Sequence, residues 1–225
     1  PISWWFRSPP QCPIIRNRSG RRTATWSVSV LAFEGPTPMS TSDTPDPFGP
    51  TAWYAGICAP GVGVLEERYR GLKQGLSGSG FELSDPFDVT TETTANYGAW
   101  ENLAGANPET VAIVGLCSMD LPNLAKLKQR GGGRWLIGGY DLGRETLDAV
   151  RDGTIQVALG QHPYLQGYLP VVALARHLRD QQPLPQGWIE ITTEVITKDN
   201  VDAIYARETD QAAQKKWYAD FVAEH

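Results

Sequence analysis

Little in this sequence supports a metal site, a disulfide-built scaffold or a membrane-spanning segment. Its 225 residues include only three cysteines, Cys12, Cys58 and Cys117, which form no CxxC pair, so at most one disulfide can form. The three histidines follow no HExxH-like spacing, which leaves a histidine-based metalloenzyme without candidates. No apolar run approaches the roughly 18 residues that a bilayer span requires. We therefore expect neither a metal nor another cofactor.

Positive charge is also scarce. Lys and Arg number 20 against 25 Asp and Glu, and no dense basic stripe occurs outside the N-terminal segment. This balance argues against nucleic acid or an anionic membrane as the main partner. A GxxxxGK[ST] motif is absent, so nucleotide binding has no specific support either. A hydrophobic fraction of 41% and a charged fraction of 20% are near globular averages and predict a folded chain, and its length of 225 residues fits one large domain or two small ones.

Residues 1–52 differ in composition from the rest. They hold nine of the 17 prolines, five arginines and no lysine. Because proline removes a backbone donor and restricts the preceding residue, we expect an irregular segment here. No basic region followed by an apolar stretch marks a secretory signal. The composition would suit either translation in a shifted frame or a lineage-specific extension.

From Trp53 onward the hydrophobic period switches repeatedly between two and 3.6, which predicts alternating strands and helices. Asp120 is expected to cap a helix, Pro163 to begin one, and Gly153 to end one. The last strand is expected at 188–196 and one or two terminal helices at 201–224. The predicted strand-helix pairs are WYAGIC with LEERYRGLKQGL, VAIVGL with the helix after Asp120, RWLIG with the helix around Leu147, and TIQVALG with residues 163–180.

Short connections between alternating strands and helices imply right-handed crossovers and a mostly parallel sheet. The predicted class is doubly wound α/β. In the helix over 163–180 the apolar residues are expected to face inward, and these are Tyr164, Tyr168, Val171, Val172 and Leu178.

Ligands of open parallel sheets bind outside the carboxyl ends of the strands. Polar residues follow several of the predicted strands and are expected to meet there: Cys117, Ser118, Asp120, Asp141 and Gln161, with Arg68 in the first turn of a neighbouring helix. Guanidinium and carboxamide groups donate in forks and a carboxylate accepts twice, which suits vicinal hydroxyls.

Each of these residues also has a purely structural interpretation. Asp141 could only cap the following helix, Arg68 could belong to a solvated charged surface, and Gln161 could satisfy a turn. Cys117 is more typical of a small buried apolar residue than of a nucleophile. No acid-base pair or nucleophile stands out, so the sequence names no catalytic residues.

The motifs Gly139–Asp141, LDAVRDG after them, and Gln161–Pro163 together resemble the periplasmic sugar-binding proteins of bacterial ABC transporters, of the ribose-binding type. The resemblance covers about residues 53–202. It implies a two-lobed, non-enzymatic receptor that closes on a sugar and delivers it to a membrane permease, outside the cytoplasm. The family's arginine, aspartate and glutamine fall on Arg68, Asp141 and Gln161. Its asparagine falls on Cys117 or Ser118, a departure that affects the hydroxyl pattern of the ligand.

The resemblance also predicts how the chain is divided. Residues 53–162 would form a nearly complete second lobe, 163–190 a returning piece of the first lobe, and 191–225 a hinge strand with terminal helices. Because the first lobe would be only partial, sugar binding is expected to be weak. The effector-binding domain of a lactose-repressor-type regulator is the alternative, since it shares the fold. An enzyme on a flavodoxin-like sheet is a third interpretation.

Overall fold

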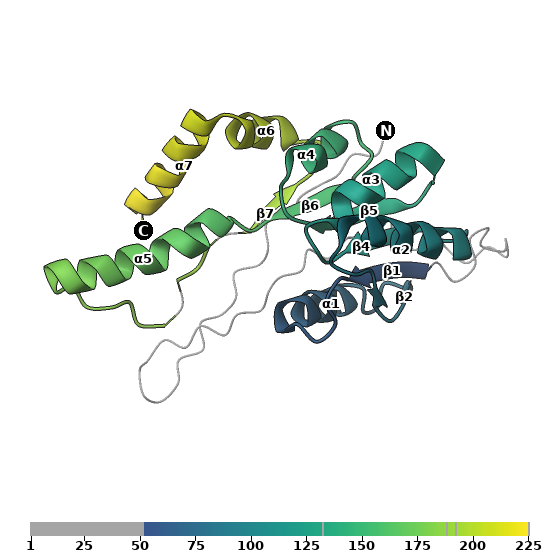
Figure 1. The fold of residues 1–225 in the computed structure, drawn as a ribbon, viewed down its shortest axis with the longest axis horizontal. Helices are drawn as coiled ribbons and strands as arrows, with labels where there is room; N and C mark the ends of the chain where they lie inside the picture. Colours follow the sequence, from purple (N-terminus) through teal and green to yellow (C-terminus); the bar gives the residue numbers. More distant parts are fainter. Residues whose placement is uncertain (1–51, 132, 188, 192, 225) are drawn as a thin grey trace.

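The computed structural model describes residues 52–224 except 132, 188 and 192. The segment predicted to be irregular therefore lies, but for Ala52, outside the described residues. Strands and helices alternate along the described chain as the periodicity predicts (Figure 1). The elements are β1 (Ala52–Ile57), α1 (Gly63–Gly75), β2 (Glu82–Leu83), β3 (Phe87–Asp88), α2 (Thr93–Ala106), β4 (Ala112–Gly115), α3 (Asp120–Gly131), β5 (Leu136–Tyr140), α4 (Arg144–Arg151), β6 (Val157–Gly160), α5 (Pro163–Asp180), β7 (Glu194–Ile196), α6 (Val201–Thr209) and α7 (Gln211–Glu224).

The strands form one seven-stranded sheet in the order β2-β1-β4-β5-β6-β7, with β3 also paired to β1. All pairings are parallel except that of β6 with β7. The α/β class and the mostly parallel sheet are confirmed. The chain runs outward from β1 to β2 and β3, then crosses back to β4, so the order reverses between β1 and β4. Such a reversal opens a crevice at the carboxyl ends of the two strands.

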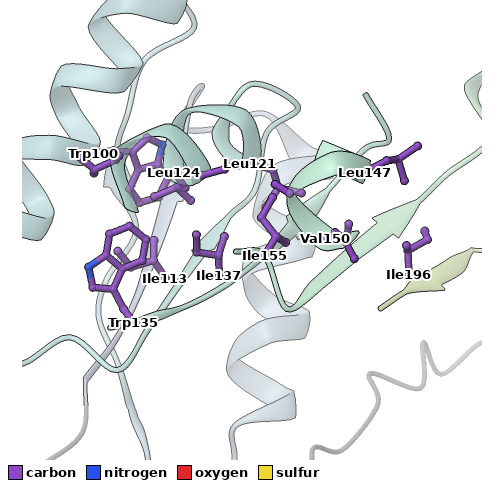
Figure 2. Close-up of a cluster of buried hydrophobic side chains, with 14 of the residues drawn as sticks. Trp100, Ile113, Leu121, Leu124, Trp135, Ile137, Leu147, Val150, Ile155 and Ile196 are labelled. Atoms are coloured by element: carbon purple, nitrogen blue, oxygen red, sulfur yellow. The ribbon is translucent and has the colours of Figure 1, made fainter. Parts of the chain in front are cut away.

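Helices cover both faces of the sheet, with α1 on one face and α2, α3 and α4 on the other (Figure 1). The main core lies under α2, α3 and α4, where apolar side chains from the helices meet those of β4, β5 and β7 (Figure 2). Trp100 of α2 is fully buried. Its ring lies over Gly56 of β1, where an added Cβ would lie 2.2 Å from the ring. Glycine at this position therefore lets α2 approach the sheet.

Helix α5 differs from the prediction. Pro163 does begin it and the helix spans the expected residues, but Tyr164, Tyr168, Val171 and Leu178 are exposed rather than facing inward, Leu178 by 81%. Helices α5 and α7 project away from the sheet (Figure 1). An apolar stripe indicates that a helix face packs against something, but it does not indicate that the partner is the adjacent sheet.

The end of the chain agrees with the prediction in part. Two helices, α6 and α7, occupy the region predicted to be helical, whereas the strand predicted over 188–196 is assigned only at β7 among the residues described there. Gly153 has the positive φ of 84° expected of a residue that ends a helix. None of the described helices is long and apolar enough to cross a membrane.

Candidate functional site

The polar residues predicted to converge do lie at one edge of the sheet, which we call the rim. Cys58 directly follows β1, Asp141 follows β5 and Gln161 follows β6, while Cys117 lies two residues beyond β4. These strands are parallel, so their carboxyl ends lie on the same side. The rim thus lies at the edge where open parallel sheets bind their ligands, and its Cys58 and Cys117 lie where the strand order reverses.

Three rim side chains form a continuous hydrogen-bonded chain. The Arg68 guanidinium donates through Nη2 to Gln161 Oε1 at 2.7 Å, and Gln161 Nε2 donates to Asp141 Oδ1 at 2.6 Å. Arg68 Nη1 also donates to the Leu116 carbonyl at 2.5 Å. These contacts contradict the alternative in which Arg68 lies on a solvated surface, and they give Gln161 a role beyond a turn.

The chemistry of its neighbours fixes the orientation of the Gln161 amide. Arginine only donates and an ionised carboxylate only accepts, so the amide oxygen must face Arg68 and the amide nitrogen must face Asp141. One acceptor oxygen of Asp141 and several donors of Arg68 remain available. The trio therefore presents donors at one end and acceptors at the other, separated by a neutral amide.

Asp141 is not a helix cap. Helix α4 begins at Arg144, its N-cap residue is Gly143, and the cap makes no side-chain hydrogen bond. The Asp141 backbone amide instead donates to the Leu159 carbonyl at 2.9 Å, which extends the pairing of β5 with β6 beyond the strand end. The carboxylate faces Gln161 rather than a helix terminus.

Backbone strain gathers at the rim. Four non-glycine residues in the described part of the chain have positive φ, and three of them, Thr90, Asp141 and His162, lie within two residues of the ends of β3, β5 and β6. The fourth, Gln181, ends α5. Non-glycine residues rarely adopt this conformation, and such residues concentrate at functional sites. This distribution singles out the rim independently of side-chain chemistry.

Tyr140 is a rim residue that the sequence analysis did not select. The Arg68 guanidinium carbon lies 4.2 Å from the centre of its ring, a cation–π geometry. Burial raises the pKa of the Tyr140 hydroxyl, with Arg68 acting in the opposite direction. The tyrosine orients the guanidinium from one side while Leu116 and Gln161 hold its nitrogens. The sequence feature that could have identified Tyr140 is its position between Gly139 and Asp141, at the end of a predicted strand.

Cys117 does not carry a free thiol. Its sulfur is bonded to that of Cys58, with the two Cα atoms 6.2 Å apart. The single bridge allowed by three cysteines therefore joins the ends of β1 and β4, and Cys117 is neither a free thiol donor to a ligand nor an ordinary apolar side chain. Ser118 is exposed beside it. Of the two positions considered for the family's asparagine, only Ser118 offers a hydroxyl.

Asp120 lies behind the rim, fully buried. Its Oδ1 accepts from Asn96 Nδ2 at 2.8 Å and from Trp100 Nε1 at 3.1 Å, and its Oδ2 accepts from the Cys117 amide at 2.8 Å. Burial raises the pKa of Asp120 to about 6, against these hydrogen bonds, which favour the ionised form. The prediction that Asp120 caps a helix is wrong: Asp120 is the first residue of α3, but its carboxylate accepts from Asn96, Trp100 and Cys117 rather than from α3 amides, and so ties α2 to the end of β4.

A second polar cluster begins at His162, directly after Gln161 in the sequence. His162 is buried, stacks on Trp217 with ring centres 4.6 Å apart, and lies 3.5 Å from Glu194. Burial lowers the pKa of the His162 ring, while Glu194 acts to raise it. Arg207 donates to both oxygens of Glu194, at 2.7 and 2.6 Å. The cluster therefore fastens α6 and α7 to β7 and to the start of α5.

No group of three or more metal-ligating side chains that could hold an ion occurs among the described residues.

Comparison with known proteins matches the chain to a family model and to many solved structures. Residues 57–182 match the model of a periplasmic binding protein domain. An ABC transporter solute-binding protein from Burkholderia graminis in complex with D-arabinose is 26% identical, with a TM-score of 0.61 over 67% of this chain and 54% of that one. A periplasmic ribose ABC transporter protein from Conexibacter woesei is 18% identical with a TM-score of 0.61, over 70% of this chain and 54% of that one.

A curated relative is the xylose/arabinose-binding protein XylF of Sulfolobus acidocaldarius, 24% identical over 152 residues, which are 64% of this chain and 37% of that protein. The chain thus spans about half the length of the solved relatives and less of the curated one. The family model covers more than half of the chain, and it includes Arg68, Asp141 and Gln161. The chain belongs to the periplasmic binding protein domain family.

Proposed function

We propose that the rim binds the hydroxyl groups of a sugar, as part of the substrate-binding component of a sugar ABC transporter. The observation that carries this proposal is the Arg68–Gln161–Asp141 chain, which offers a donor fork and a carboxylate to adjacent hydroxyls. Relatives with the same fold include proteins in complex with D-arabinose, D-allose and myo-inositol. These ligands share adjacent hydroxyl groups. A sugar and a transporter permease are the proposed partners, and the chain's role is binding rather than catalysis.

The disulfide supports a location outside the cytoplasm. Bridges such as Cys58–Cys117 persist in oxidising compartments, whereas thiols in the cytoplasm are kept reduced. A lactose-repressor-type regulator, the alternative with the same fold, acts in the reducing compartment. The bridge therefore favours the transport receptor over the regulator.

We further propose that the chain divides into lobes as the family resemblance implies, with residues 53–162 in one lobe and 163–190 in another. Helix α5 leaves the sheet and exposes Val171, Leu174 and Leu178, which are apolar (Figure 1). The rest of the first lobe would cover this face and close over the rim. The rim of one lobe touches only one side of a ligand, so it is expected to bind weakly on its own.

Nuclear magnetic resonance titration with pentoses, hexoses and polyols tests the proposal, because it detects weak binding residue by residue. We expect signals of the rim residues Arg68, Asp141 and Gln161 to shift with a dissociation constant weaker than about 100 μM. A submicromolar ligand would contradict the one-sided cleft. Rim signals that respond to none of the sugars would contradict sugar binding itself.

The substitution Asp141→Asn tests the role of the carboxylate. Asparagine tolerates positive φ and can still accept from Gln161, so the free energy of unfolding should change by only about 0.5 kcal/mol or less. Binding should weaken by about 1.5 to 3 kcal/mol, roughly 10- to 150-fold in the dissociation constant, because an acceptor becomes a donor toward the sugar. The slope of the titration at low sugar concentration measures this loss.

The matched control is Asp148→Asn. Asp148 is exposed on α4 and pairs with Arg151 at 3.6 Å, away from the rim. Asp148→Asn makes the same chemical change as Asp141→Asn and should leave the titration slope as in the unmodified protein. An unchanged slope for Asp141→Asn as well would assign Asp141 to the scaffold.

A further inference from the structure

Helix α1, which carries Arg68, is weakly anchored. Leu65 is its only buried residue, and its N-cap residue Val62 makes no side-chain hydrogen bond. The chain enters the helix through Gly61, which has a φ of 84°. Helices with few buried side chains open readily. Besides Leu65, the half-buried Tyr69 packs on the same small cluster and donates to the Ser84 carbonyl at 2.9 Å. The position of α1 therefore depends on this small cluster.

The Cys58–Cys117 disulfide lies at that small cluster. Cys117 is buried in it with Ile57, Leu65 and Leu116, separate from the main core, and Cys58 packs against it. The bridge closes 59 residues of sequence, and the Cys58 amide donates to the Cys117 sulfur at 3.2 Å. It therefore forms part of the surface on which α1 rests.

The bridge also lies between the two points that determine where Arg68 can reach. On one side, Cys58 begins the connection from β1 to α1, from which the helix starts. On the other side, Leu116 directly precedes Cys117, and its carbonyl accepts from Arg68 Nη1. The sheet pairs β1 with β4 as far as Gly56 and Gly115, and the bridge extends this connection by two residues, to the point where the chain leaves for α1.

We propose that the Cys58–Cys117 disulfide is a positioning element for Arg68: it holds α1 so that the guanidinium reaches Leu116, Gln161 and the ring of Tyr140. Without the bridge, α1 separates from the ends of β1 and β4, and Arg68 leaves the chain that it forms with Gln161 and Asp141. The consequence for sugar rests on the proposed function. The position of Arg68 does not, because it can be measured without a ligand.

The experiment compares the unmodified protein with Cys58→Ala/Cys117→Ala, leaving Cys12 in both. The readouts are the Arg68 guanidinium signals in nuclear magnetic resonance, assigned with Arg68→Lys, and amide hydrogen exchange along the chain. With the bridge, the Arg68 signals should be distinct and protected. Without it, they should move to the position of exposed arginines, and α1 amides should exchange at least about tenfold faster while β4, β5 and β6 stay protected.

Ile196→Ala is the matched control for a general loss of stability. Ile196 is fully buried in the main core and lies in β7, away from α1. Its truncation should lower the melting temperature yet leave the Arg68 signals and the exchange of α1 as in the unmodified protein. If the disulfide only stabilised the fold, the cysteine double variant and Ile196→Ala would show the same Arg68 signals, and this result would overturn the proposal.

Two further measurements test the same role of the disulfide, one by chemical reduction and one by sugar binding. If the double variant is poorly folded, the unmodified protein is instead reduced with a dithiol in a stabilising osmolyte. The dithiol supplies two electrons and two protons, so the S–S bond breaks into two thiols while the dithiol closes to its own disulfide. Unmoved Arg68 signals in that folded, reduced protein overturn the proposal.

The second measurement is a D-arabinose titration of the bridged and unbridged forms. Where the bridged protein responds to D-arabinose, a titration slope at least about tenfold lower without the bridge supports the proposal, and an equal, non-zero slope overturns it. If the bridged protein does not respond to sugar while Arg68 still moves on loss of the bridge, the proposed function fails and the positioning role stands.

Discussion

Replacing Asp120 by alanine should lower the free energy of unfolding by about 3 to 4 kcal/mol, the largest single effect we expect in the described part of the chain. Three donors, on Asn96, Trp100 and the Cys117 backbone, lose their acceptor. All lie where water cannot easily replace it, because Asn96 and Trp100 are fully buried. Removing the carboxylate also removes its own burial cost, which is why the loss is not larger. Chemical denaturation measures it.

Asp148→Ala is the control for this prediction. That carboxylate is exposed and weakly paired, so its removal should change stability by about 0.5 kcal/mol or less. A loss below about 1 kcal/mol for Asp120→Ala would mean that the three donors find other partners, and that Asp120 is not what joins α2 to the end of β4.

The parts of the structure that the sequence predicted are those that depend on local pattern and on the topology it implies. The strand-helix units were recognisable because each is encoded in consecutive residues. The convergence of Asp141 and Gln161 followed from parallel strands alone, since every such strand ends at the same edge. Arg68 was placed there by the helix that follows β1, although it lies in the second turn of α1 and not in the first. None of these inferences required a distance between remote residues.

The parts that the sequence did not predict depend on contacts between remote segments. Asp120 looks like a helix cap, but its partners Asn96 and Trp100 precede it by 24 and 20 residues. The bridge between Cys58 and Cys117 spans 59 residues, and cysteine spacing does not say which pair will meet. The exposed face of α5 shows a related limit. Periodicity identifies an apolar stripe on a helix without identifying what the stripe faces.

Replacing Glu194 by alanine should lower the free energy of unfolding by about 2 to 4 kcal/mol, because it leaves a nearly buried arginine with half of its partners. Arg207 exposes 9% of its side chain and donates to both Glu194 oxygens, while Glu208 would remain as its other acidic partner. Burial is the largest single influence on the pKa of Arg207 and lowers it, but the hydrogen bonds and charges of Glu194 and Glu208 together outweigh burial and raise the pKa overall. Without Glu194, the Arg207 charge stays buried and is compensated only by Glu208.

The loss of stability should appear first in α6 and α7, which Arg207 and its neighbours hold against β7 and the start of α5. The Arg207 guanidinium carbon lies 4.5 Å from the centre of the Trp217 ring, which stacks on His162, so freeing Arg207 loosens α7 from the start of α5. Hydrogen exchange should accelerate in α6 and α7 before it does in β4 or β5. Asp202→Ala is the matched control, because Asp202 of α6 also pairs with an arginine, Arg151 of α4, at 2.9 Å, but its side chain is exposed. It should cost about 0 to 1 kcal/mol. Equal losses for the two variants would show that burial of Arg207 contributes nothing, and that the cluster around Glu194 is no more than a surface ion pair.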